Sequence, residues 1–504
     1  MTLPNLPNNI PHYPVQTVEF KGLNLTPNTK DGEFSDTLGL QSANYPYITQ
    51  IPERVAVSGY SSPTDIYVWD RDLFVVDGTS LKKNGTTIGT VTAGTKHMAV
   101  INTKLVIYPD KKYVDLTDDT MHSLVAKEKY YNSSYTVTHN SVTGNGIGET
   151  FAAGDTVDVV ATGLTANRIV VQSVEANKLT FVDNAISGTA SGRLTIRTSV
   201  PELDFICSSN NRIWGVNIEE NTVYASALGD PTDWFTYTSE AGAYTVAVGS
   251  EGPFTGICNY GGAVLCFKEN MLHKILGSYP SEYYMIDAPV YGVQQGSEKS
   301  LVVINNILYY KGVYGVYQYG GNQPVSISYN LGRGIFTGAV GGTDGRKYYI
   351  DMADPDGVYH LYAYDLVHGL WLKEEDGQMA AIANLDRDVY YVKAGAIKRI
   401  GSEVSNSLSW YGEFVETVEG TLNRKGYLKL IFRLDMAAGS TLNVCAKEDR
   451  RPYRLLWTQS VTDAVTLLVP IRLGRCDRWQ LKIQGIGSVT IRAIGREFVG
   501  GSLK

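Results

Sequence analysis

The chain has 504 residues, too many for a single compact core, and its 43% hydrophobic and 19% charged residues exclude a disordered chain. The net charge of −7 argues against a surface that binds nucleic acid, which needs clustered lysine and arginine. No apolar run approaches about 18 residues, and the N-terminus lacks a charged region before an apolar one. We therefore expect no membrane span and no signal peptide, and a chain that stays soluble in the cytoplasm where it is made.

The N-terminal segment, residues 1–45, is rich in proline and asparagine and carries one short alternating stretch at residues 15–20. Proline removes backbone hydrogen-bond donors and rules out a helix here. We predict that residues 1–45 form an extended arm, which lies on a neighbouring surface or has no fixed structure.

An internal repeat of turn, strand, turn and strand dominates the middle of the chain. Its clearest copies contain tyrosine pairs that begin at Tyr309, Tyr348 and Tyr390, so the spacings are 39 (348 − 309) and 42 (390 − 348) residues. The many glycines and tyrosines, 51 and 34, also favour short strands and tight turns. Weaker copies lie upstream, at residues 72–76, 104–108, 212–216 and 263–267.

A period of about 40 to 50 residues is typical of propeller blades, which bury their faces against one another. We predict an all-β fold with a β-propeller of about seven blades, built from residues 46–128 and 199–402. Signature motifs of the common propeller families are absent, so this prediction depends on the period alone. The alternative is a run of antiparallel meanders folded into sandwiches.

Two segments differ from the repeat. Residues 129–198 interrupt the period, and their alternating strands predict a small β-barrel domain inserted in a blade loop. Residues 403–504 contain five alternating strands separated by turns, which predict a C-terminal β-sandwich.

Catalytic motifs for nucleophilic, phosphate-binding, zinc-protease or dinucleotide chemistry are absent. Carboxylate pairs of the kind that glycoside hydrolysis needs occur at Asp230 with Asp233, Asp351 with Asp354, and Glu374 with Glu375. We interpret them, with the nearby tyrosines and tryptophans, as turn and packing residues. The sequence therefore predicts no enzyme, no catalytic, cofactor-binding or metal-binding residues, and no cofactor.

Other polar and sulfur-containing groups have equally ordinary interpretations. His360 and His368 are eight residues apart, but zinc needs a third ligand. The five cysteines contain no CxxC pair and are expected to be reduced and buried. Arg472, Arg475 and Arg478 form a basic stretch that is either a solvated sheet edge or a docking patch for an acidic partner subunit.

Several phrases resemble the tail hub and nozzle proteins of tailed bacteriophages, also called packaged-DNA stabilisation proteins. The most specific is Asn-Arg-Ile-Trp-Gly at 211–215, followed by the stretch 223–234, which ends in Asp-Pro-Thr-Asp-Trp. Shorter matching phrases occur at residues 20–24, 32–36, 45–48, 315–328, 475–479 and 485–487.

This resemblance implies a structural virion protein without catalysis. It implies a homo-oligomeric ring, six-fold in the family, at the distal end of the tail and around the DNA exit channel. The expected neighbours are tail adaptor or fibre proteins, and genome DNA would pass through the lumen without specific binding. Assembly would take place in the host cytoplasm. The alternatives are a glycan- or host-receptor-binding tail module and a secreted propeller hydrolase.

Overall fold

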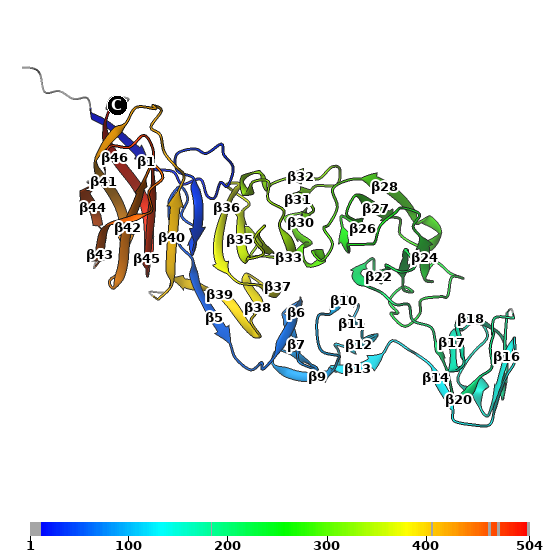
Figure 1. Cartoon of the computed structure of the whole chain (residues 1–504). Coiled ribbons are helices and arrows are strands. Elements are labelled where there is room, and N and C mark those ends of the chain that lie inside the picture. Colours follow the sequence, from blue (N-terminus) through cyan, green and yellow to red (C-terminus); the bar gives the residue numbers. More distant parts are fainter. Residues whose placement is uncertain (1–11, 183, 405–406, 462–464, 471–473, 501–504) are drawn as a thin grey trace, which may run out of the picture. The chain divides into compact units, whose positions relative to one another are not determined.

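The computed structural model describes residues 12–182, 184–404, 407–461, 465–470 and 474–500, and their regular structure is almost entirely antiparallel β-sheet (Figure 1). None of the helices in these ranges is long and apolar enough to cross a bilayer. The chain divides into a first unit, residues 1–60, 309–319 and 324–504, and a second unit, residues 61–308 and 320–323. The short 3-10 helices are η1 (Ile147–Glu149), η2 (Pro280–Glu282), η3 (Glu298–Ser300) and η4 (Tyr329–Leu331).

Four of the propeller blades belong to the second unit, and each is a meander of four strands. The first two are β6 (Pro63–Trp69), β7 (Asp72–Asp77), β8 (Ser80–Lys83) and β9 (Thr86–Thr90), then β10 (His97–Ile101), β11 (Lys104–Tyr108), β12 (Lys112–Asp115) and β13 (Thr120–Ser123). The next two are β21 (Phe205–Ser209), β22 (Arg212–Asn217), β23 (Thr222–Ala225) and β24 (Tyr244–Ala247), then β25 (Gly256–Tyr260), β26 (Ala263–Lys268), β27 (Met271–Leu276) and β28 (Tyr284–Pro289).

The first strands of successive blades lie against one another, β10 against β21 and β21 against β25. Blades that meet along their first strands are arranged around an axis, as a propeller requires. The second strand of each blade is the most completely buried, because it is covered on both faces by the neighbouring blades; β22 and β26 have no exposed residue.

The remaining three blades complete the set of seven. One is divided between the two units, β29 (Val302–Ile304), β30 (Ile307–Gly312), β31 (Gly315–Tyr319) and β32 (Val325–Ser326). Two belong to the first unit: β33 (Thr337–Thr343), β34 (Lys347–Ala353), β35 (Tyr359–Asp365) and β36 (Leu370–Asp376), then β37 (Met379–Leu385), β38 (Asp388–Lys393), β39 (Ala396–Val404) and β5 (Pro52–Val57).

The last blade takes its fourth strand from the other end of the chain. β5 pairs with β39 in the register Ile397 to Val57 and Ile400 to Arg54. One blade thus joins residues more than three hundred positions apart, which fastens the start of the propeller to its end.

The sequence repeat marks the second strand of every blade. The tyrosine pairs lie on β30, β34 and β38, and the four weaker copies lie on β7, β11, β22 and β26. Tyr309 and Tyr348, from neighbouring blades, have ring centroids 5.4 Å apart. The predicted all-β propeller of about seven blades is confirmed, and the period reflects one deeply buried strand per blade.

The inserted domain extends from β14 (Glu128–Tyr131) to β20 (Ser191–Thr198), between the second and third blades. Its strands form a single sheet in the order β14, β20, β17 (Thr156–Thr162), β18 (Leu164–Glu175), β19 (Lys178–Phe181), β16 (Ser141–Gly144) and β15 (Tyr135–Val137). The sheet curls, because the Tyr131 ring on β14 covers Gly144 on β16, and the Tyr135 hydroxyl on β15 donates to the Gly192 carbonyl on β20. It encloses its own core and forms the small barrel predicted for residues 129–198.

The C-terminal strands form a sandwich of two sheets around one core. One sheet has the order β3 (Leu40–Gln41), β4 (Ile48–Gln50), β46 (Val489–Gly500), β41 (Lys425–Met436) and β44 (Val465–Pro470), with β1 (His12–Thr17) also on β46. The other has the order β2 (Phe34–Leu38), β40 (Ser409–Phe414), β45 (Trp479–Ile486), β42 (Ser440–Glu448) and β43 (Arg454–Val461). Buried and half-buried residues alternate along β42, as expected for a strand with one face on the core.

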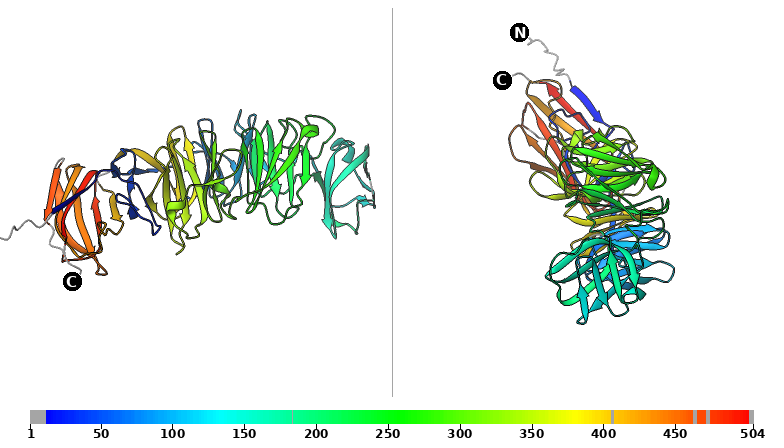
Figure 2. Two further views of the ribbon diagram at one scale, coloured as in Figure 1. Left: turned by 90° about the horizontal axis from the view of Figure 1, so that it is seen from above. Right: turned by 90° about the vertical axis from the view of Figure 1, so that its right-hand side faces the viewer.

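The N-terminal segment differs from the arm expected over residues 1–45. Its described part contributes β1 to β3 to the sandwich, where the blue N-terminal strands lie among the orange and red C-terminal ones (Figures 1 and 2). The strand β1 could not be predicted from the sequence, because Pro14 argues against a central strand. It is accommodated because β1 lies at the free edge of β46. Residues 1–11 of the expected arm lie outside the described residues.

Candidate functional site

The inner strands of the second unit, where a propeller has its central channel, carry paired charges. The Asp65 carboxylate on β6 accepts hydrogen bonds from the Lys299 ammonium at 2.8 Å and from the Lys96 amide at 2.7 Å. Lys299 lies on η3, in the connection to the fifth blade. Burial, assisted by Lys299, lowers the pKa of the neighbouring His97 to about 4, so this imidazole is neutral at pH 7. These groups bind each other, which leaves no open charged site around Asp65.

A serine, a histidine and an aspartate form a hydrogen-bonded chain that sequence patterns did not reveal. Ser250 Oγ lies 2.8 Å from His273 Nε2, and His273 Nδ1 lies 2.6 Å from Asp287 Oδ1. Hydrolase triads place the aspartate in the interior and the serine in a substrate cleft. Here the histidine is fully buried and the Asp287 side chain is 54% exposed. Lys268 also donates to the Ser250 carbonyl at 2.6 Å. The arrangement fastens the loop around Ser250 to the fourth blade.

The carboxylate pairs that could serve glycoside hydrolysis make structural contacts instead. Asp230 and Asp233 accept backbone hydrogen bonds from Thr232, Phe235 and Thr236, and so cap their own turns. Asp354 caps its own turn in the same way.

Glu374 and Glu375 lie in a buried network of opposite charges. Glu374 pairs with Arg54 at 2.7 Å and Lys347 at 2.8 Å, and Glu375 pairs with Lys393 at 2.6 Å. Burial alone would raise the pKa of Glu374, but Lys347 and Arg54 hold it below its ordinary value. Both carboxylates are therefore ionised and structural.

Asp351 is the one carboxyl of these pairs with a strongly raised pKa. Its side chain is fully buried, Oδ2 accepts the Met379 amide at 2.9 Å, and Oδ1 has no hydrogen-bond partner among the described residues. Burial, with a contribution from Glu375, raises its pKa to about 7 against the pull of Lys393. The folded state therefore holds a proton that the unfolded chain releases near pH 4, so stability falls as pH rises from about 4 to 7.

Asp351→Asn is expected to remove that loss, because the amide is neutral at every pH and still offers an oxygen to Met379. At pH 8 the variant should unfold at a higher urea concentration than the unsubstituted chain, by a free energy on the order of 2 kcal/mol. At pH 5 the difference should shrink. Urea unfolding at both pH values measures it, and a variant less stable than the parent at pH 8 would contradict the assignment.

The histidines and arginines singled out in the sequence have local partners. His360 lies between Asp376 and Asp354, at 2.6 and 3.3 Å, and His368 lies 3.1 Å from Asp365. In the described ranges, no three or more His, Cys, Asp or Glu residues are arranged to hold a metal ion. Arg478 pairs with Glu416 at 3.2 Å, Arg475 is exposed, and Arg472 lies outside the described residues.

The cysteines are reduced, and burial raises the pKa of all five thiols, which makes them poor nucleophiles.

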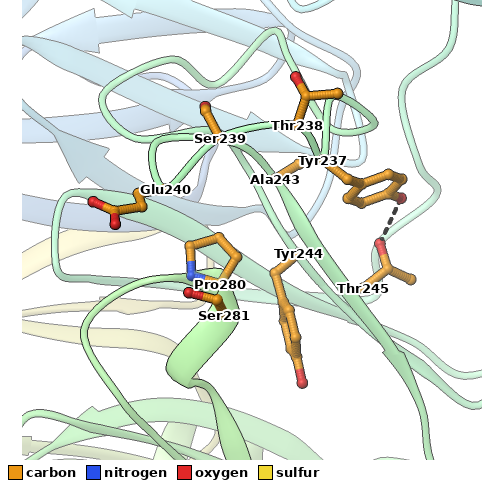
Figure 3. A pocket seen from close by; sticks show the side chains of 9 residues that line it. All are labelled: Tyr237, Thr238, Ser239, Glu240, Ala243, Tyr244, Thr245, Pro280 and Ser281. Carbon is orange, nitrogen blue, oxygen red and sulfur yellow. Dashed lines mark hydrogen bonds between the residues drawn. The ribbon is translucent and has the colours of Figure 1, made fainter.

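A groove of about 680 Å³ in the second unit is lined by polar and aromatic groups (Figure 3). One wall is the long loop between β23 and β24, and the other is the start of η2. The lining residues are Tyr237, Thr238, Ser239, Glu240, Ala243, Tyr244, Thr245, Pro280 and Ser281. We call this cavity the tyrosine groove.

The floor of the tyrosine groove rests on an aromatic cluster. The Tyr244 ring packs edge-on against Tyr283 at 5.0 Å, and both contact Trp214, at 6.0 and 5.1 Å. Tyr237 is 53% exposed, and its hydroxyl is hydrogen-bonded to Thr245 at 3.0 Å, which fixes the ring over the groove (Figure 3). The groove is the best-formed candidate binding site among the described residues that no internal contact already fills.

No protein-family model and no curated protein matches the chain. Among solved structures it is similar to the computationally designed Ika8 protein (13% identity, TM-score 0.36, 69% of this chain and 99% of that one) and to the RRP9 WD40 repeats (8%, 0.32, 70% and 99%). It is also similar to PorZ, a surface component of the type-IX secretion system of Porphyromonas gingivalis (11%, 0.29, 88% and 78%).

Proposed function

We propose that the chain is a structural subunit of a bacteriophage tail, which assembles with copies of itself into a nozzle or hub ring around the DNA exit channel. The proposal depends first on the resemblance of the phrase at 223–234. The structural observation that carries it is the packing role of those residues. Trp234 is 1% exposed and fills the core shared by the second and third blades, and its indole donates to the Pro231 carbonyl at 2.7 Å. A phrase whose residues pack the interior is consistent with a scaffold subunit.

Rigidity is the second support. β5 closes the last blade, and Arg54 on it is buried and paired with Glu374 and Glu375. In the same unit, β1, β2 and β4 fasten residues 12–50 to the sandwich. A subunit that must withstand the passage of a genome benefits from having its N-terminal residues built into both of its sheet systems.

DNA in this proposal passes between copies of the chain and not through a propeller. The ion pair of Asp65 and Lys299 joins the first strand of one blade to the connection before the fifth, and its atoms are 2.8 Å apart. The proposal therefore assigns these inner residues to internal packing of the propeller. A ring of copies has its own lumen, and the net charge of −7 suits a wall that repels phosphates.

The inserted domain is held against the third blade. Arg168 on β18 donates to the Tyr224 hydroxyl at 2.8 Å and pairs with Glu220, so the insert contacts the third blade within the phrase at 223–234. We propose that the insert and the sandwich contact neighbouring copies, or tail adaptor and fibre proteins.

Sedimentation of the purified full-length chain tests the proposal. We expect a closed oligomer, with six copies as the leading assignment, whose mass stays constant over a tenfold range of concentration. A chain that sediments as a monomer at every concentration, alone and in extracts of infected cells, would refute the ring.

A further inference from the structure

The tyrosine groove combines aromatic faces with hydroxyl groups and one carboxylate. Tyr237 and Tyr244 supply the rings, and Glu240 supplies the charge. The hydroxyl groups around them belong to Thr238, Ser239, Thr245 and Ser281. We propose that this groove binds a short neutral carbohydrate chain, an activity that goes beyond the structural role proposed above and does not depend on it.

The chemistry of the lining selects this class of ligand. Sugar rings present apolar C–H faces that pack on aromatic rings, and their hydroxyls both donate and accept hydrogen bonds. The lining contains no lysine, arginine or histidine, so it has no cation for a phosphate, sulfate or carboxylate ligand. Glu240 adds a negative charge that disfavours anions further. The volume of about 680 Å³ lies within the usual range for small-molecule sites.

The groove is built in advance of any ligand. Arg212, which is 1% exposed, donates from Nη2 to the Glu240 carbonyl at 2.7 Å and from Nη1 to the carbonyls of Ser226, at 2.9 Å, and Gly242. The Ala243 amide donates to the Thr236 carbonyl at 2.7 Å, which closes the loop on itself.

Gly242 permits this closure, because a Cβ there would lie 2.4 Å from the Thr236 carbonyl oxygen. The buried guanidinium thus holds the loop from beneath, while the side chains of residues 237–240 stay exposed. A preformed wall lowers the ordering cost of binding.

This loop has eighteen residues, 226–243, between β23 and β24. The corresponding connection between β27 and β28 runs from 277 to 283, and that between β12 and β13 from 116 to 119. Trp234 in this loop packs between the second and third blades, whereas residues 237–240 are exposed and line the groove. Long ordered loops on a rigid scaffold are where binding sites are usually placed.

The test uses the full-length chain and an array of neutral oligosaccharides, followed by titration calorimetry with the best probe. We expect dissociation constants on the order of 1 mM or tighter. Tyr237→Ala should weaken binding at least tenfold, because it removes one stacking face without disturbing the buried cluster. Glu240→Gln should weaken it less. The matched control is Tyr284→Ala on β28, since Tyr284 is 56% exposed but does not line the groove.

Three results would overturn the inference. One is the absence of binding by every neutral probe at a probe concentration 10 times the expected dissociation constant. Another is binding that survives Tyr237→Ala unchanged. The third is preference for a lysine-rich peptide, lost in Glu240→Gln, which would assign the groove to a cationic peptide instead. None of these results bears on the proposed ring. That proposal is tested separately, by sedimentation of the same sample.

Discussion

Arg54→Ala is expected to destabilise the first unit by about 3 to 5 kcal/mol, because it leaves buried carboxylates without their partner. The Arg54 side chain is 5% exposed and that of Glu374 is 1% exposed. Removing the guanidinium leaves Glu374 paired with Lys347 but without Arg54. It also removes one partner of Glu375. Arg54 also lies on β5, so the strand that closes the last blade loses its strongest side-chain attachment. Urea unfolding, together with hydrogen exchange of the β5 amides, measures both effects.

The matched control is Arg399→Ala on the neighbouring strand β39. Arg399 pairs with Asp388 at 2.7 Å, but the two side chains are 39% and 45% exposed. An exposed pair contributes about 1 kcal/mol or less. Arg54→Ala should therefore lower the free energy of unfolding several times more than Arg399→Ala does. Equal losses would argue against a structural role for the buried network.

The Arg54 effect should also depend on pH in a defined direction. The pKa of Glu374 is held below its ordinary value, so the network stabilises the fold above the ordinary pKa of glutamate. That contribution is lost as pH falls through the lowered pKa. The difference between the unsubstituted chain and Arg54→Ala should therefore be largest at neutral pH and narrow in acid.

Trp234→Ala is expected to cost about 3 to 5 kcal/mol in the second unit, the range for a buried aromatic side chain truncated in a core. The indole packs edge-on to Tyr108, with centroids 6.5 Å apart, and belongs to the cluster that joins the second and third blades. Trp234→Phe should cost less, since it keeps a ring in the core but loses the hydrogen bond to Pro231. Calorimetric melting of the variants measures the series.

Trp69→Ala serves as the control for Trp234, because Trp69 on β6 is 42% exposed. We expect it to change stability by about 0.5 kcal/mol or less. If Trp234→Ala were as mild as Trp69→Ala, the phrase at 223–234 would have a role other than packing, and the structural argument for the proposed function would lose its main support.

The repeat could be predicted from sequence because each blade buries most of its second strand, and so repeats one apolar stretch per period, with a tyrosine pair in three of the copies. The insert and the sandwich could be predicted because their strands alternate. β1 could not, since Pro14 in an edge strand looks the same in sequence as proline in an arm. The role of β5 was also hidden, because its partner β39 lies over three hundred residues away.

The candidate sites also divide into those that the sequence predicts and those that it does not. Asp230 and Asp233 could be interpreted as turn residues from sequence, because their hydrogen bonds are local. The hydrogen-bonded series Ser250, His273 and Asp287 joins three separate segments, and the spacing of these residues in the sequence does not predict it. The tyrosine groove likewise depends on Arg212, which holds the loop at 226–243 from β22 of the same blade. Its only local signal was the unusual length of that loop.

The most direct measurement is a single-particle image of the assembled full-length chain. We predict a closed ring of copies, six-fold in the leading assignment, with a lumen between subunits that is wide enough for duplex DNA and is lined by more acidic than basic side chains. Single propellers without a ring, or a ring whose lumen is lined mainly by lysine and arginine, would contradict the proposed tail function.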